Sequence, residues 1–212
     1  MMEVRFAVAS VRAEPRAAAP TLVFRIRVEE ASGALIQAAL LRCQVFIDVP
    51  RRKYSAVEGE RLNEIVGEPA RWSDTMRPLL WMTVPLVLPR CQGTADVDLP
   101  ISCSYDFEVA SSKYFRALDD GEVPLLFMFT GTIFAAGQSA MQVTQLPWDS
   151  EARFRLPVRT WRDAMAQHFG DSTWLRLERQ SFDALDRVRR HGGYVTWDEV
   201  VEALCAEKRV SL

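Results

Sequence analysis

Residues 21–30, TLVFRIRVEE, decide the fold class of this chain. Apolar side chains at positions 22, 24, 26 and 28 alternate with Arg25, Arg27 and Glu29. A period of two residues is typical of a β-strand that buries one face and exposes the other to water. The segment therefore predicts a half-buried strand, the clearest one in the sequence.

Similar patterns on both sides of this segment predict a β-rich body of about eight to ten strands. Further strands are expected at residues 4–9, 35–49, 77–89, 94–100, 102–110, 123–135, 140–146 and 152–156. The run at 123–135 is apolar on both faces, which is typical of a central strand. Pro78, Pro85 and Pro89 indicate that the strand over 77–89 lies at a sheet edge or is broken, because proline cannot donate a hydrogen bond to a neighbouring strand.

Helical signals interrupt the strands and then replace them toward the end of the chain. Ser55 and Glu58 form a capping box for a short helix over residues 55–66. One or two helical turns are also expected at 111–118. From Pro157 onward, apolar residues recur with helical spacing, and this pattern predicts C-terminal helices.

The order of these elements predicts an α+β fold, in which an antiparallel β-sheet or two-sheet sandwich carries a C-terminal helical segment. We place the β-rich body, with its short inserted helix, at residues 1–157 and the helical segment at residues 158–212. No Gly/Ser-rich linker separates the two parts, so we expect them to pack together as a single unit.

The composition is that of an ordinary folded protein. Of the 212 residues, 49% are hydrophobic and 25% are charged, and the formal net charge is −2. This balance disfavours nucleic acid as a partner, because a nucleic-acid site needs an excess of basic side chains. The longest apolar stretch, residues 79–88, is too short to insert into a membrane. Since the N-terminus lacks a signal-peptide pattern, we expect a cytoplasmic protein.

The common motifs for catalysis, cofactor binding and metal binding do not occur in the sequence. The two histidines, His168 and His191, offer few ligands for zinc, and the cysteines show no CxxC spacing. We therefore expect no catalytic residue, no cofactor and no metal site. The cysteines, which we expect to be reduced and mostly buried, are Cys43, Cys91, Cys103 and Cys205.

Charged residues leave an enzyme open as an alternative. Its first candidates for inspection are Asp119, Asp120, His168 and Arg155. We favour a polar hairpin and an outward strand face as the explanation of the acidic residues, and the helix dipole as the explanation of a histidine near a helix end. These acidic residues could also form paired carboxylates or a calcium site. They are Asp106, Glu108, Asp119, Asp120 and Glu122.

Arginine and tryptophan are the residue types that suggest recognition. The chain has 23 Arg and three Lys, which reflects either a coding bias or the ability of arginine to pair with carboxylates. The triplet Arg-Arg-Lys at 51–53 either binds a phosphate or an acidic partner, or forms a solvated loop. Trp161, Trp174 and Trp197 belong to the helical segment and suit either core packing or an interface. We name these tryptophans and Arg155 as candidate partner-binding residues.

Several stretches together carry a resemblance to a known family. They are residues 20–26 (PTLVFRI), 105–109 (YDFEV), 118–126 (LDDGEVPLL), 174–177 (WLRL) and 196–198 (TWD). Over nearly its full length, the chain resembles a family of uncharacterised actinobacterial proteins of about this size. Genes of that family are often placed beside those of NiFe hydrogenases. The resemblance therefore implies an accessory or assembly role, with a hydrogenase subunit or accessory factor as the partner.

We expect a non-catalytic binding or accessory protein whose partner is another protein. The alternatives are a holdase chaperone, since the order of strands and helices is loosely similar to SecB, a small-molecule-binding β-sandwich, and the enzyme considered above. A partner-binding protein should expose an apolar patch, whereas a small-molecule-binding protein should enclose a ligand-sized pocket. Formation of a homo-oligomer is left open.

Overall fold

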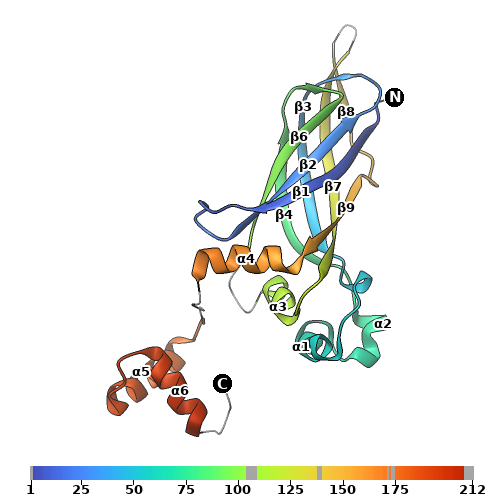
Figure 1. Cartoon of the computed structure of the whole chain (residues 1–212). Coiled ribbons are helices and arrows are strands. Elements are labelled where there is room, and N and C mark those ends of the chain that lie inside the picture. Colours follow the sequence, from blue (N-terminus) through green and yellow to red (C-terminus); the bar gives the residue numbers. More distant parts are fainter. Residues whose placement is uncertain (1, 104–108, 138–139, 171, 173–174, 208–212) are drawn as a thin grey trace. The chain divides into compact units, whose positions relative to one another are not determined.

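The computed structural model describes residues 2–103, 109–137, 140–170, 172 and 175–207 (Figure 1). All strand pairs in this part of the chain are antiparallel and belong to two sheets. Helices lie between the strands and at the C-terminal end, so the expected α+β class is confirmed. The chain forms two compact units, residues 1–173 and 174–212.

The first sheet contains three strands in the order β1 (Val4–Ala13), β2 (Thr21–Glu30) and β6 (Thr94–Ser102). The apolar side chains of β2 at positions 22, 24, 26 and 28 are buried, as their alternation predicts. Arg25 and Arg27 are exposed and form ion pairs with aspartates of β6. The outer face of this sheet is therefore charged.

The second sheet contains six strands. Four follow the order β4-β3-β7-β8, while β5 pairs with β3 and β9 pairs with β7. The bounds are Leu35–Ile47 for β3, Leu79–Leu88 for β4, Cys91–Gln92 for β5, Glu122–Ala136 for β7, Met141–Gln145 for β8 and Glu151–Pro157 for β9. Strand β7 has partners on both sides, which confirms the predicted central strand. Strand β4, which contains Pro85, lies at the end of the strand order, as the prolines in residues 77–89 indicate.

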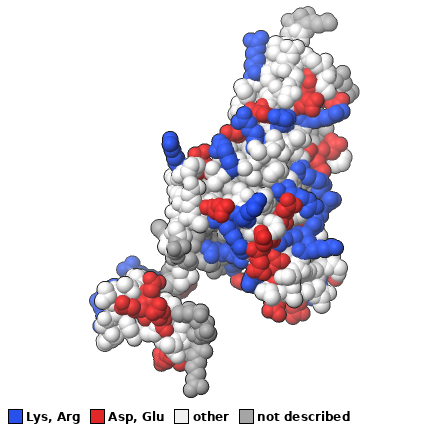
Figure 2. Space-filling view, in the orientation of Figure 1, with Lys and Arg blue, Asp and Glu red and all other residues white. Residues whose placement is uncertain are grey.

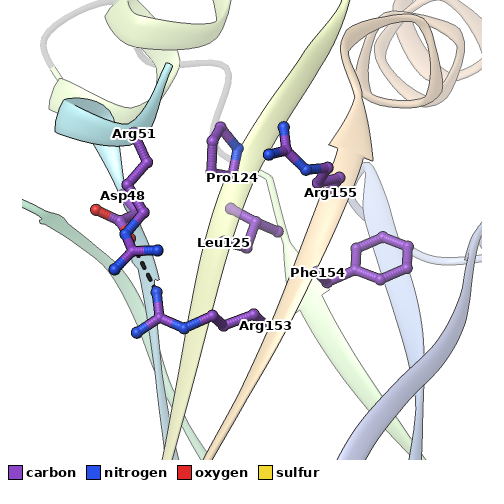
Figure 3. A pocket seen from close by; sticks show the side chains of 7 residues that line it. All are labelled: Asp48, Arg51, Pro124, Leu125, Arg153, Phe154 and Arg155. Carbon is purple, nitrogen blue, oxygen red and sulfur yellow. Dashed lines mark hydrogen bonds and ion pairs between the residues drawn. The ribbon is translucent and has the colours of Figure 1, made fainter.

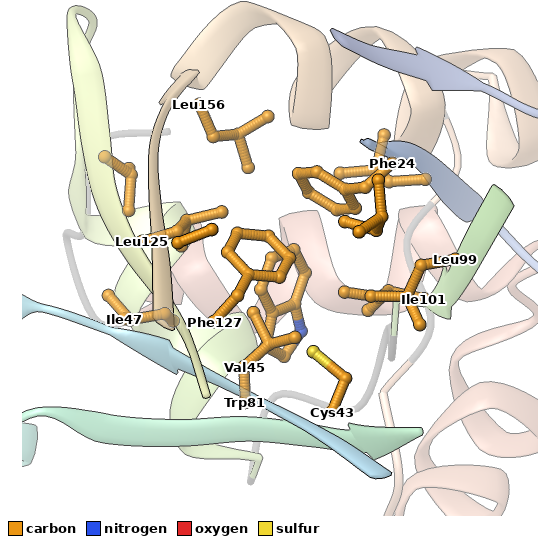
Figure 4. Close-up of a cluster of buried hydrophobic side chains, with 14 of the residues drawn as sticks. Phe24, Cys43, Val45, Ile47, Trp81, Leu99, Ile101, Leu125, Phe127 and Leu156 are labelled. Atoms are coloured by element: carbon orange, nitrogen blue, oxygen red, sulfur yellow. The ribbon is translucent and has the colours of Figure 1, made fainter. Parts of the chain in front are cut away.

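Aromatic side chains join the two sheets in one core (Figure 4). The ring of Phe24 in β2 lies 6.3 Å from Trp81 in β4, 5.2 Å from Phe127 in β7 and 5.9 Å from Phe154 in β9, measured between ring centroids. All three pairs meet edge to face, a favourable arrangement for aromatic rings. The two sheets therefore pack face to face as a sandwich.

Short helices gather at one end of the strands (Figure 1). They are α1 (Ala56–Val66), α2 (Trp72–Thr75) and α3 (Ala110–Ala117). The predicted capping box of α1 is confirmed, since Oγ of Ser55 accepts a hydrogen bond from the backbone N of Glu58 at 3.1 Å, and Oε2 of Glu58 accepts one from the backbone N of Ser55 at 3.0 Å. Helix α2 has no counterpart in the expectations from sequence.

The C-terminal helices divide between the two compact units. Helix α4 (Val158–Phe169) begins directly after β9, where the pattern changes in the sequence, and lies in the first unit. Helices α5 (Arg179–Gly192) and α6 (Trp197–Glu207) form the second unit. That these last helices pack on the β-rich body as one unit stays a prediction. No helix in the described ranges is long and apolar enough to cross a membrane.

One strand prediction needs correction. The strand expected over 102–110 is not a separate strand at either of its ends, because Ser102 is the last residue of β6 and Ala110 is the first of α3. Residues 104–108, between them, lie outside the described residues.

Gly131 in β7 marks a close approach between two strands. Its φ is +142°, and a Cβ at this position would lie 2.2 Å from the carbonyl oxygen of Leu40 and 2.8 Å from Cα of Leu41. Both atoms belong to the backbone of β3 and cannot move aside alone. We expect Gly131→Ala to lower the free energy of unfolding by more than about 1 kcal/mol. Urea denaturation would measure the loss, with Thr130→Ala in the same strand as the control; equal stability of the two variants would contradict the expectation.

Candidate functional site: an arginine-lined pocket

A pocket of about 310 Å³ opens where β7, β9 and the end of β3 come together. It is lined by Asp48, Arg51, Pro124, Leu125, Arg153, Phe154 and Arg155 (Figure 3). Figure 3 shows Arg51, Asp48 and Arg153 on one side of Leu125 and Arg155 on the other. The pocket therefore has cationic side chains on two sides.

The register of β9 on β7 places two of the arginines. Arg153 and Arg155 are two residues apart in β9, so their side chains leave the same face of the sheet. Phe154 between them faces the sandwich core, where its ring meets Phe24. Arg155 lies opposite Pro124 in the ladder, and this pairing brings the arginine beside the start of β7.

Asp48 holds two of the arginines in place. It follows the last residue of β3 and precedes the short helical turn η1 (Val49–Arg51). Its Oδ2 lies 3.1 Å from Nε of Arg51 and 3.3 Å from Nη1 of Arg153, and its side chain is only 9% exposed. The backbone N of Asp48 donates a hydrogen bond to the carbonyl oxygen of Pro124 at 2.8 Å. The carboxylate is thus fixed at the wall of the pocket and orients the guanidinium groups around it.

Three guanidinium groups and one carboxylate line the pocket, and two further carboxylates flank it. Oε1 of Glu151 accepts hydrogen bonds from Nε and Nη2 of Arg153 at 3.2 and 3.0 Å. The nearest acidic partner of Arg155 is Glu122, whose Oε2 is 3.9 Å from Nη1, and the Arg155 side chain is 67% exposed. Guanidinium groups pair with carboxylates and phosphates through two parallel hydrogen bonds. This arrangement can bind an anionic group.

Over the strands, basic and acidic side chains are interspersed on the face that Figure 2 shows. They do not gather there into one basic stripe, which is the surface that nucleic-acid backbones require. The arginine-lined pocket is therefore a local feature on a mixed surface and suits a small anionic group.

The structure places the predicted partner-binding residues in different parts of the chain. Arg155 lines the arginine pocket. Trp161 of α4 is buried and stacks on Phe115 of α3, with 5.1 Å between the ring centroids and 9° between the planes. Trp197 of α6 is partly exposed in the second unit, and Trp174 lies outside the described residues. Their roles in partner binding stay predictions.

The residues named for an enzyme are engaged in separate contacts. Oδ1 of Asp119 accepts a hydrogen bond from Nη1 of Arg61 at 2.6 Å, and the carbonyl oxygen of Asp120 accepts one from Nη2 of Arg52 at 2.6 Å. His168 lies in the last turn of α4. Asp106 and Glu108 of the acidic group lie outside the described residues.

Two observations on the described part of the chain concern metal ligands and thiols. No group of three or more His, Cys, Asp or Glu side chains there is arranged to hold a metal ion. Burial raises the pKa of the Cys43 and Cys103 thiols to about 12. Both thiols are therefore protonated at neutral pH and are poor nucleophiles.

The model of a family of unknown function, DUF6084, matches residues 1–211. The chain belongs to this family. No curated protein matches it. Similarity between this DUF6084 protein and solved structures is distant, and it supports no functional statement.

Three of these structures illustrate the distance. The CARDB domain of a Pyrococcus furiosus protein, in complex with di-metal ions, is 7% identical with a TM-score of 0.28, and the match covers 74% of this chain and 92% of that one. β-Glucosidase 3B from Thermotoga neapolitana, in complex with α-D-glucose, is 14% identical with a TM-score of 0.27, covering 73% of this chain and 17% of the enzyme. A β-glucosidase from Kluyveromyces marxianus is 8% identical with a TM-score of 0.26, covering 73% and 15%.

Sequence reasoning found only part of the pocket of this DUF6084 protein. Arg155 was singled out, and Arg51 belonged to a triplet for which an acidic partner was one of two interpretations. Asp48 and Arg153 were missed. The alternation of Arg153 and Arg155 around an apolar residue was a usable signal, because it places both guanidinium groups on one face of a strand.

Proposed function

We propose that this DUF6084 protein is a non-catalytic binding protein that holds an acidic group of a partner protein in the arginine-lined pocket. The observation that carries the proposal is that the guanidinium groups of Arg51, Arg153 and Arg155 line one pocket of about 310 Å³. Because Asp48 already orients Arg51 and Arg153, less side-chain entropy is lost when an anion binds.

The resemblance seen in the sequence supports a choice of partner. We propose a subunit or accessory factor of a NiFe hydrogenase, in the cytoplasm of an actinobacterium, as the first partner to test. An accessory protein needs reversible and selective binding, and complementary charges at an interface supply selectivity and rapid association more than raw affinity.

A second candidate is binding of an apolar partner surface by α5 and α6. It is favoured by the exposure of large apolar side chains in this unit, although solvent-exposed apolar residues also occur singly on ordinary surfaces. Those side chains are Leu175, Leu177, Phe182, Val188, Val195, Trp197 and Val201. This candidate also covers the holdase alternative, since a holdase would use an apolar surface.

Affinity purification from a native host tests both candidates with paired variants. We expect a partner that is recovered with the wild-type protein to be reduced roughly tenfold or more with Arg153→Ser/Arg155→Ser, because each charged hydrogen bond contributes about 1.5–3 kcal/mol. The matched control is Arg25→Ser/Arg27→Ser, which removes the same charge from the outer face of the other sheet. Equal recovery with the pocket variant would contradict the proposal. Loss only with Trp197→Ala would favour the second candidate.

A further inference from the structure

The outer face of the second sheet carries a group of adjacent apolar side chains on β3, β7 and β8. Ala38 of β3 lies opposite Phe134 of β7, which in turn lies opposite Val143 of β8. Leu40 and Met141 are each two residues from a member of this row, so their side chains leave the same face. Leu40, Met141 and Val143 are each more than half exposed. Apolar side chains that are grouped in this way, rather than scattered, mark an interaction surface.

Two side chains of opposite charge lie next to this apolar group, on the two sides of β7. Arg42 of β3 lies opposite Thr130 of β7, and Glu151 of β9 lies opposite Met128 of β7. Because Met128 and Thr130 are two residues apart in one strand, Arg42 and Glu151 leave the same face and are offset by about 7 Å along the strand direction. Glu151 is paired with Arg153, whereas Arg42 has no ion-pair partner among the described residues.

We infer that this face binds the same face of a second copy of the chain, in a reversible homodimer whose two-fold axis runs along β7. Rotation about that axis exchanges the β3 side of the face with the side of β8 and β9. Ala38 of each copy then lies over Val143 of the other copy, and Phe134 meets its own counterpart near the axis. The rotation also brings Arg42 of each copy opposite Glu151 of the other.

Charge complementarity favours a second copy as the occupant of this face. An interface between two identical patches is isologous, so symmetry forms the contact between Arg42 and Glu151 twice. The apolar side chains between these contacts bring no like charges together. A different protein would have to present the reversed pattern of charges independently, whereas a second copy supplies it by rotation alone.

The size of the overlap indicates how stable the dimer is. Three strands about 4.8 Å apart, over residues 128–136 of β7, give a footprint of roughly 450 Å² per copy. Stable interfaces commonly bury about 800 Å² per partner, and smaller ones belong mostly to transient complexes. Two sheet faces also pack with their strands within about 30° of each other, which this axis allows. We therefore expect a dimer that dissociates on dilution.

Sedimentation velocity of the full-length protein, at concentrations from about 1 to 500 µM, tests this inference. We expect the weight-average mass to rise with concentration from that of the 24.1 kDa monomer toward twice that value. Leu40→Ser/Val143→Ser should raise the dissociation constant roughly tenfold or more, because each copy loses apolar contacts. Val57→Ser, at an exposed apolar residue of α1, is the control and should associate like the wild type.

A charge exchange tests which residues face each other. Arg42→Glu and Glu151→Arg should each weaken self-association roughly tenfold, because like charges then meet at both symmetric contacts. An equimolar mixture of the two variants should restore the dimer, because each contact in the mixed dimer again joins opposite charges. The charge-matched control is Arg16→Glu, at an exposed residue between β1 and β2, which should leave association unchanged.

Three results would overturn the inference. They are a wild-type protein that stays monomeric over the whole concentration range, a dimer that none of the substitutions at this face weakens, and charge variants that do not associate when mixed. Circular dichroism spectra like that of the wild type show that the variants are folded. The experiment does not involve an anion in the arginine-lined pocket, so the proposed function stands or fails separately.

Discussion

Replacement of Phe24 by alanine is expected to lower the free energy of unfolding by about 3–5 kcal/mol. Phe24 is fully buried, and its ring meets those of Trp81, Phe127 and Phe154 on three strands of the opposite sheet. Truncation removes all three edge-to-face contacts and leaves a cavity between the sheets. The expected loss of stability is large because the three strands belong to one sheet. That sheet cannot close the cavity left by the missing ring unless its strands shift.

Urea denaturation followed by circular dichroism would measure this effect. The control is Val87→Ala in β4, whose side chain is 59% exposed, and a change below about 1 kcal/mol is expected there. A loss below about 1 kcal/mol for Phe24→Ala would show that the aromatic cluster is not what joins the two sheets.

Replacement of Arg52 by the uncharged residue methionine is the second substitution that we expect to lower stability strongly. Nη2 of Arg52 lies 2.8 Å from Oε1 of Glu58, and the two side chains are only 9% and 6% exposed. Oε1 of Glu58 also accepts a hydrogen bond from the backbone N of Asp119 at 3.0 Å. Arg52→Met leaves this carboxylate buried without its cation, which costs about 3–5 kcal/mol of stability.

A double-mutant cycle measures the interaction energy between Arg52 and Glu58 separately from their contacts with other residues. Arg52→Met combined with Glu58→Gln should destabilise less than the sum of the two single substitutions, by at least about 1 kcal/mol, because neither partner then remains as an unpaired buried charge. The exposed pair of Arg61 and Asp119 is the control, and Arg61→Met should cost less than about 1 kcal/mol. Additive losses in the cycle would contradict a coupled ion pair.

The Arg52 contacts also support the arginine-lined pocket. Nη2 of Arg52 donates to the carbonyl oxygen of Asp120, close to the first residue of β7, at 2.6 Å. This bond fastens the segment after β3 to the segment before β7. Arg51, the preceding residue, is thereby held near the pocket that β7 and β9 form.

Only a fraction of this site was accessible from the sequence. The pocket draws its lining from three separate segments, at 48–51, 124–125 and 153–155. The ion pair between Asp48 and Arg153 joins residues that are 105 positions apart. Local spacing contains no information about such a contact, since it depends on which strands pair and in which register.

The sequence by itself determined the local elements of this protein. The alternation in β2, the capping box of α1 and the edge position of the proline-containing β4 all follow from interactions within a few residues or from burial of one face. Only the tertiary structure decided the different surroundings of the adjacent residues Arg51 and Arg52. Arg51 lines the pocket, whereas Arg52 is buried against Glu58. The physical reason is that the partner of a charged side chain is set by strand register and by the packing of distant segments.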